Sequence, residues 1–259
     1  MSDGTGPGPG PGPGMPGAEA TGKIALVTGA NQGLGFEIAR GLGRKGATIL
    51  LGARKAGAGE AAAATLRAEG LDAHVLPIDV TDAASIAAAA ARIAADWGRL
   101  DILVNNAAVS LDKDSRPSTA DLDLMRETYE ANVFGLVAVT QAMLPLLRKA
   151  PAGRIVNMST GLASLTLSSG RAAPFSFSRL LAYNSSKTAV NGITVQFANE
   201  LLDTPIKVNA ANPGLCATGL SGGKGRPASE GAAVVLGLAL LGEDGPTGGL
   251  FGDGGQMAW

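Results

Sequence analysis

From residue 23 onward, short apolar runs alternate with longer stretches of helical character, and this alternation constrains the fold more than any other feature. The runs lack the polar alternation of strands that face solvent on one side, so we expect strands buried on both faces. Strands of that kind, each followed by a helix, predict a single doubly wound α/β domain with a parallel sheet of about seven strands and helices on both faces. The expected strands are 23–27, 47–51, 73–77, 101–105, 154–157, 207–211 and 249–251, and the expected helices are 34–45, 59–69, 83–97, 120–149, 181–202 and 229–241.

The amino-terminal segment differs in composition from the rest of the chain, because residues 4–17 are mostly glycine and proline. Glycine raises the entropy lost on folding and proline removes a backbone donor, so such a segment cannot build a packed core. We expect residues 1–22 to form a disordered tail, either native or added for expression. Residues 23–259 then form the folded domain that carries the candidate site.

A glycine-rich turn directly follows the first expected strand and reads Thr28-Gly-Ala-Asn-Gln-Gly-Leu-Gly35. The first glycine permits a tight turn, the second lets a pyrophosphate approach the backbone, and the third lets the next helix pack closely on the strand. The free N–H groups at the start of that helix would face the phosphates. This position in a βαβ unit predicts a dinucleotide site of the Rossmann type. The expected cofactor contacts here are Gly29, Asn31, Gln32, Gly33, Leu34 and Gly35.

The end of the second expected strand indicates which dinucleotide binds. Sites for NAD usually place Asp or Glu there to hold the ribose 2′-hydroxyl, whereas an arginine accommodates the 2′-phosphate of NADP. This chain reads Leu51-Gly-Ala-Arg-Lys55, without a carboxylate. The guanidinium of Arg54 offers a fork of donors to a phosphate. We therefore expect NADP(H) as the cofactor, with Arg54 at the 2′-phosphate.

Tyr183 and Lys187 lie four residues apart in an expected helix, so their side chains share one face. A phenol has a reference pKa of about 10, and a nearby ammonium lowers this pKa because it favours the phenolate. We expect Tyr183 to act as general acid when a carbonyl is reduced and as general base in the reverse reaction.

Five motifs in the same order resemble those of the short-chain dehydrogenase/reductase family, and the resemblance covers nearly the whole chain from residue 23 to residue 259. The glycine turn matches Thr-Gly-x-x-x-Gly-x-Gly, and Tyr183 with Lys187 matches Tyr-x-x-x-Lys. The other three are Asn105-Asn-Ala-Ala108 at the fourth strand, the helix asparagine Asn132, and Pro213-Gly-Leu-Cys-Ala-Thr218, which is similar to the segment that holds the nicotinamide.

The resemblance implies roles for further residues. Asp79 and Val80 would flank the adenine, Lys187 would also hydrogen-bond the nicotinamide ribose, and Asn132 would hold a water in a proton relay to Lys187. The remaining cofactor contacts are expected from Asn106, Ala107, Pro213, Gly214, Cys216 and Thr218, together with Tyr183 and Lys187 themselves.

The hydroxyl that would orient the substrate carbonyl has two candidates. The family often shows Ile-Val-Asn-x-Ser-Ser after the fifth strand, with the second serine as the catalytic one. This chain reads Ile155-Val-Asn-Met-Ser-Thr160. Thr160 falls at the catalytic position and Ser159 remains the alternative, because either hydroxyl can donate to a carbonyl oxygen.

The segment between this hydroxyl and Tyr183 is longer than in many family members, and its glycine, serine and proline content predicts a loop over 161–182. With the terminal stretch 249–259, it resembles the carbonyl reductase and menthone reductase branch. Members of that branch are often monomeric, so we expect a monomer or a homodimer.

Charge and composition exclude several other classes. The net charge is −1 without a basic stripe, which argues against nucleic acid or an anionic membrane as a partner. The chain has one histidine and one cysteine, which are too few ligands for a zinc site built on those residue types. We found no apolar run of membrane-spanning length and no secretory signal, and therefore expect a cytoplasmic protein.

These observations predict an NADPH-dependent oxidoreductase that interconverts a small-molecule carbonyl and an alcohol. Two alternatives stay open. One is reduction of an imine or another tailoring step in secondary metabolism, and the other is a catalytically silent NADP(H)-binding regulator.

Overall fold

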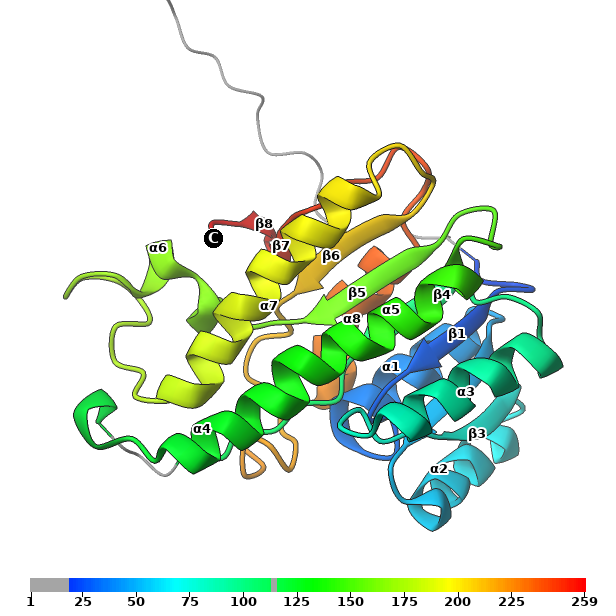
Figure 1. Cartoon of the computed structure of the whole chain (residues 1–259), viewed down its shortest axis with the longest axis horizontal. Helices are drawn as coiled ribbons and strands as arrows, with labels where there is room; N and C mark the ends of the chain where they lie inside the picture. The colour runs from blue at the N-terminus through cyan, green and yellow to red at the C-terminus, as the bar shows by residue number, and fades with distance from the viewer. Residues whose placement is uncertain (1–18, 113–115) are drawn as a thin grey trace, which may run out of the picture.

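The computed structural model describes residues 19–112 and 116–259, which form one α/β domain on an eight-stranded sheet (Figure 1). The strand order is β3-β2-β1-β4-β5-β6-β7-β8, so the order reverses between β1 and β4. In such sheets the ligand binds at this reversal, beyond the carboxyl ends of the strands. The strands are β1 (Ile24–Val27), β2 (Thr48–Ala53), β3 (Ala73–Pro77), β4 (Ile102–Asn105), β5 (Arg154–Met158), β6 (Lys207–Ala211), β7 (Leu250–Gly252) and β8 (Gly255–Met257).

Helices cover both faces of the sheet, as predicted. One buried apolar cluster joins the sheet to α1, α2 and α8, and a second joins it to α3, α5 and α7. Strands β1 and β5 are buried at every residue, which explains why they lack polar alternation. The helices are α1 (Gly33–Arg44), α2 (Ala56–Ala68), α3 (Ala83–Asp96), α4 (Leu122–Tyr129), α5 (Gly135–Leu147), α6 (Leu165–Ser168), α7 (Leu181–Glu200) and α8 (Ala228–Ala239), and the short helices are η1 (Pro117–Thr119), η2 (Glu130–Phe134) and η3 (Gly161–Ala163).

The sheet has one strand more than the seven or so expected, and the extra strand is not parallel. After β7 the chain turns at residues 253–254 and returns as β8, which pairs with β7 in the antiparallel direction. The turn uses glycines, and Gly255 has a φ of 101°. A three-residue strand next to a glycine turn gives too short a pattern to be recognised in the sequence.

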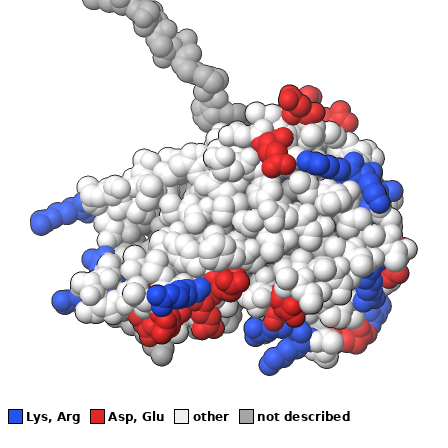
Figure 2. All heavy atoms as spheres, in the orientation of Figure 1, with Lys and Arg blue, Asp and Glu red and all other residues white. Residues whose placement is uncertain are grey.

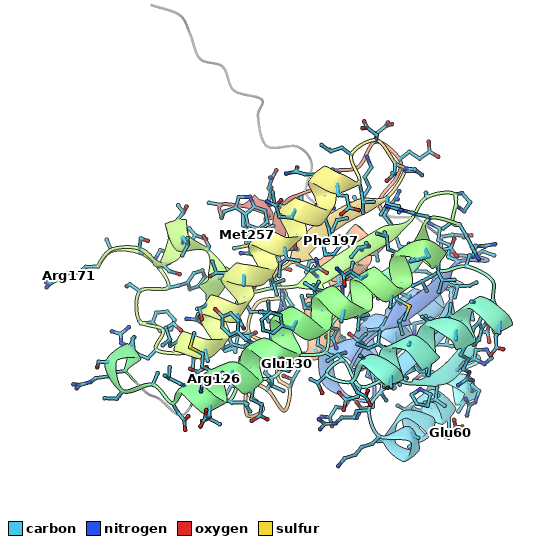
Figure 3. All side chains as sticks on the ribbon, viewed as in Figure 1. Glu60, Arg126, Glu130, Arg171, Phe197 and Met257 are labelled. Atoms are coloured by element: carbon cyan, nitrogen blue, oxygen red, sulfur yellow. The ribbon has the colours of Figure 1, made fainter. Side chains whose placement is uncertain are left out.

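Two other segments differ from the expected elements. The segment 161–182, expected as a loop, contains η3 and α6, and its Arg171 points away from the sheet (Figure 3). At the other end, residues 19–22 belong to the folded domain rather than to the tail, because Ala20 is fully buried and its N–H donates to the Lys45 carbonyl at 2.7 Å. The rest of the expected tail, residues 1–18, lies outside the described residues.

A buried row of polar side chains crosses the sheet beside its carboxyl edge. Asn105 donates to Thr140 of α5 at 3.0 Å and to Asn157 of β5 at 2.9 Å, and Asn157 donates to Thr194 of α7 at 2.9 Å. Each member has a partner, so the row ties both helices to the sheet without an unpaired polar group. It fixes α7 relative to the strand ends that carry the candidate site.

The helical run Leu122–Leu147 has an apolar window with a mean hydropathy of 1.4, long enough by length and composition to cross a membrane. We had expected no such segment. However, 56% of this window is buried within the described fold, as in the core helix of a folded domain. Figure 2, in the orientation of Figure 1, shows Lys, Arg, Asp and Glu mainly around the rim of this face, whereas the centre, over α5 and α7, is largely uncharged.

Candidate active site

The glycine turn between β1 and α1 has the shape that a dinucleotide site requires. Gly29 and Gly33 have φ values of 64° and 59°, in the left-handed region that favours glycine. A Cβ at Gly35 would lie 2.6 Å from the Gly29 carbonyl oxygen, so the close approach of α1 to the turn requires glycine there. The first turn of α1 has no acidic residue, and Gln32 at its N-cap makes no side-chain cap. In the part of the chain that the structure describes, no side chain caps the first-turn N–H groups of α1, which leaves them available to a phosphate.

The segment after β4 is bonded directly to this turn. The Thr28 hydroxyl accepts from the backbone N–H groups of Asn106 and Ala107, both at 3.0 Å. The Asn106 side chain donates to the Thr28 carbonyl at 2.8 Å and to the Gly29 carbonyl at 3.2 Å. The two predicted cofactor segments on either side of the strand-order reversal therefore form one unit. Thr28, which we did not predict as a site residue, holds that unit together.

Arg54 and Asp79 lie at the same corner of the sheet, after β2 and β3. Burial opposes ionisation of Asp79, but hydrogen bonds from the N–H and hydroxyl of Thr81, with the nearby Arg54 charge, hold the pKa of this carboxyl below its usual value. Arg54 is exposed and free to turn toward a ligand. Val80 follows Asp79 and is half-buried. Its carbonyl oxygen packs against Gly135, where an added Cβ would lie 2.6 Å from that oxygen. This arrangement fits the adenosine end of a dinucleotide.

Tyr183 and Lys187 share one face of α7, as predicted. Lys187 is 2% exposed, and its Nζ lies 5.9 Å from the centroid of the Tyr183 ring. The same Nζ donates to the carbonyl of Met158, the last residue of β5, at 2.8 Å. The pair is therefore anchored at the end of the strand that leads into Ser159 and Thr160.

The acidity of this pair differs from our expectation. Burial raises the pKa of Tyr183 to about 12 and lowers the pKa of Lys187 to about 8. We had expected the ammonium to lower the pKa of the phenol. Here desolvation outweighs that effect, because the ammonium is directed to the Met158 carbonyl and lies beside the ring.

Asn132 lies in the π-helical turn η2, where α4 passes into α5. Its side-chain oxygen accepts from the Val109 N–H at 2.8 Å, and its amide donates to the Val109 carbonyl at 2.9 Å and to Ser186 Oγ at 3.0 Å. The side chain thus fixes the loop after β4 to α7. Both of its polar groups have protein partners, and the water relay expected at Asn132 stays a prediction.

Ser159 and Thr160 differ in what their hydroxyls contact. Ser159 is 4% exposed and donates to Asn191 Oδ1 of α7 at 2.6 Å. Thr160 is half-buried and caps η3, where its Oγ1 accepts from the Leu162 N–H at 3.3 Å. Within residues 19–112 and 116–259, the Thr160 hydroxyl proton has no acceptor. The geometry therefore favours Thr160 as the donor to a substrate.

The loop after β6 carries Pro213, Gly214, Cys216 and Thr218. Arg226 links the start of this loop to its end. The Arg226 guanidinium donates to the Pro213 carbonyl at 2.6 Å and forms a bidentate pair with Asp253, in the turn between β7 and β8. Thr218 lies against the glycine turn, since a Cβ at Gly33 would be 3.3 Å from its methyl group. Cys216 directs its buried thiol to the Pro213 carbonyl and to α8, so this side chain has a packing role.

Comparison with known proteins agrees with this geometry. A family model described as short chain dehydrogenase matches residues 23–227. The chain belongs to the short-chain dehydrogenase family. It is 36% identical to the short-chain dehydrogenase anuI of Penicillium roqueforti, over 87% of this chain and 91% of that protein.

Two solved structures share the fold of this chain. Salutaridine reductase from Papaver somniferum is 28% identical, with 89% of this chain and 99% of that chain covered and a TM-score of 0.77. The RhlG/NADP active-site complex from Pseudomonas aeruginosa is also 28% identical, with 92% and 97% covered and a TM-score of 0.81.

Three residues of this short-chain dehydrogenase hold the site together but were absent from our predicted set. Thr28 had a signal in the sequence, because it directly precedes the first glycine of the turn. Ser186 and Asp112 had none. Ser186 is one of two adjacent serines within the Tyr-x-x-x-Lys segment, and Asp112 contacts α7 across 70 residues of sequence.

The choice between the two hydroxyls can be tested directly. We expect Thr160→Ala to lower kcat by about a hundredfold, the scale for loss of one donor to a developing oxyanion. Ser159→Ala should cost less than about tenfold, because it removes only the bond to Asn191. Steady-state kinetics on one carbonyl substrate would decide, and equal mild losses from both variants would contradict the assignment.

Proposed function

We propose that this short-chain dehydrogenase interconverts a small-molecule carbonyl and an alcohol with NADP(H) as cofactor. The observation that carries the proposal is the placement of Lys187, whose Nζ lies beside the Tyr183 ring and bonds to the carbonyl two residues before Thr160. Tyr183 as the acid, Lys187 as its charged neighbour and Thr160 as the hydroxyl donor thereby lie at one edge of the sheet. That set of groups suits carbonyl reduction.

The cofactor proposal rests on the glycine turn and on Arg54. The N–H groups of α1 and the turn Gly29–Gly35 would hold the pyrophosphate, and Arg54 would pair with the 2′-phosphate. Asp79 and Val80 would flank the adenine, and Asn106, Ala107 and the loop from Pro213 to Thr218 would hold the nicotinamide end. The similarity to a relative solved with NADP supports this choice.

NADPH, when bound, supplies the hydride for the carbonyl carbon. The Thr160 hydroxyl would donate to the substrate oxygen and orient the carbonyl. The Tyr183 hydroxyl would then pass its proton to that oxygen as negative charge develops on it. Lys187 would stabilise the resulting phenolate by its charge.

The segment between Thr160 and Tyr183 supports an apolar substrate. The ring of Phe175 packs on Gly161, next to Thr160, so closely that a Cβ there would lie 2.7 Å from the ring. Leu165 and Phe177 from the same segment and Leu215 from the loop after β6 are 64%, 70% and 65% exposed. Apolar side chains left in solvent on loops beside a site commonly mark where a ligand binds.

The test is turnover of NADPH with a panel of ketones, aldehydes and imines of graded hydrophobicity. We expect reduction of apolar ketones or aldehydes, which would be measured as a fall in NADPH absorbance. Turnover of imines alone would replace the proposed reaction with imine reduction. Tight NADPH binding without turnover on any member would support the silent regulator. The expected monomeric or homodimeric state and the cytoplasmic location stay predictions.

Replacing Arg54 tests the cofactor choice. We expect Arg54→Ala to raise the KM for NADPH by about tenfold or more, since a hydrogen bond to a charged group contributes about 1.5–3 kcal/mol. The KM for NADH, which lacks the 2′-phosphate, should change by less than about twofold. Arg44→Ala is the matched control, because it removes an exposed arginine that pairs with Glu69. An equal rise for both cofactors would contradict the assignment.

A further inference from the structure

The helix that carries Tyr183 receives its amino-terminal cap from a distant part of the chain. Helix α7 begins at Leu181, and the residue in the cap position, Leu180, makes no side-chain hydrogen bond. The carboxylate of Asp112 takes that place. Its Oδ1 accepts from the Ala182 N–H and its Oδ2 from the Tyr183 N–H, both at 2.9 Å. These are the second and third N–H groups of the helix, the ones that a capping side chain usually serves.

Tyr183 is thereby held through both polar groups of its backbone. Its N–H donates to Asp112, and its carbonyl accepts from Ser186 Oγ at 2.7 Å. Ser186 in turn accepts from the side chain of Asn132. Asp112 reaches the start of α7 from the loop after β4, and Asn132 reaches it from η2 through Ser186, so a shift of the first turn would break one of these two contacts.

The loop that supplies Asp112 also carries the proposed cofactor contacts. It leaves β4 at Asn106 and Ala107, which are bonded to the glycine turn through Thr28. It is held midway at Val109 by Asn132, and it reaches α7 at Asp112. The segment 106–112 therefore runs, with a fixed contact at each stage, from the glycine turn to the residue proposed as the proton donor.

We propose that Asp112 is a positioning residue that sets the place of the Tyr183 hydroxyl relative to the cofactor segment 106–109. This inference rests on the proposed function, in which Tyr183 passes a proton to the substrate. A negative charge at a helix amino terminus is favourable, and two charge-assisted bonds orient the helix start. Without them two N–H groups lose their acceptor and the first turn frays. Because proton and hydride transfer require precise placement, a small displacement of Tyr183 lowers the rate.

The test compares Asp112→Ala with Asp82→Ala. Asp82 is the matched control, because its carboxylate caps α3 through the N–H groups of Ala84 and Ser85 at 2.9 and 3.3 Å. We expect Asp112→Ala to lower kcat by about thirtyfold or more, with the Kd for NADPH changed by less than about twofold. Asp82→Ala should lower the melting temperature by a comparable amount and leave kcat near the wild-type value. Asp112→Asn keeps one acceptor oxygen and should recover part of the lost kcat.

Amide hydrogen exchange provides a readout that does not depend on turnover. We expect faster exchange at the N–H groups of Ala182 and Tyr183 in Asp112→Ala and no change there in Asp82→Ala. A kcat within about threefold of wild type, or a loss of the same size in Asp82→Ala, would overturn the inference. If the wild type turns over no substrate of the panel, the proposed function fails by itself. Unchanged exchange at these two positions would then overturn the role of Asp112 separately.

Discussion

We expect Tyr183→Phe to lower kcat for carbonyl reduction by about a thousandfold, within the range for loss of a general acid. Phenylalanine keeps the ring that packs beside Lys187 and removes only the hydroxyl that would donate the proton. Affinity for NADPH should change by less than about twofold, because the substitution leaves the proposed phosphate contacts at the glycine turn and Arg54 intact. Single-turnover kinetics would report the chemical step, and fluorescence titration would report cofactor binding.

The control for this prediction is the other tyrosine of the chain, Tyr129 of α4. Tyr129→Phe removes the same hydroxyl from a half-buried position and should leave kcat within about twofold of wild type. A loss of less than about tenfold in Tyr183→Phe, or losses of similar size in both variants, would assign the proton transfer to another group.

The acidities of Tyr183 and Lys187 define the conditions for this test. With a pKa of about 12, Tyr183 holds its proton at neutral pH and can donate it. With a pKa of about 8, Lys187 keeps its charge only below that pH. Since that charge would stabilise the phenolate in the proposed mechanism, kcat should be compared below pH 8, where both groups are protonated.

Much of this site was predictable because its residues follow strand ends. Gly29, Arg54, Asp79, Asn106 and Pro213 each lie within two residues of the end of a strand whose apolar run is visible in the sequence. Parallel strands bring their carboxyl ends to one edge of the sheet, so order along the chain predicts proximity in space. The spacing of Tyr183 and Lys187 was equally informative, because a helix places residues four apart on one face.

The remaining features depend on contacts that no local pattern encodes. Asp112 caps a helix that begins 69 residues later, and nothing near Asp112 in the sequence marks it as a cap. The pKa of Tyr183 follows from burial and from where the Lys187 ammonium points, which spacing alone does not give. The antiparallel β8 depends on pairing with β7 across a glycine turn. Each of these is set by tertiary packing.

The largest loss of stability is expected from Arg154, at the opposite edge of the sheet from the site. This arginine begins β5, is 2% exposed, and donates five hydrogen bonds to backbone carbonyls. The acceptors are Gly153, Pro205, Leu241 and Gly242, which belong to three separate connections. Burial lowers the pKa of Arg154, and the nearby Glu243 partly offsets this effect. One side chain thus joins the ends of β5, α7 and α8.

We expect Arg154→Ala to lower the free energy of unfolding by about 3 kcal/mol or more, because it removes a buried side chain with its five hydrogen bonds and opens a cavity. That corresponds to a melting temperature lower by roughly 6–12 °C for a domain of this size. Arg154→Lys keeps the charge but cannot reproduce the forked bonds, so its loss should be intermediate. Arg148→Ala is the control, since Arg148 forms a 3.5 Å surface pair with Glu200 that should contribute less than about 1 kcal/mol. Urea unfolding of the three variants would measure these differences, and equal midpoints for Arg154→Ala and Arg148→Ala would show that the contacts of Arg154 with these carbonyls do not stabilise the fold.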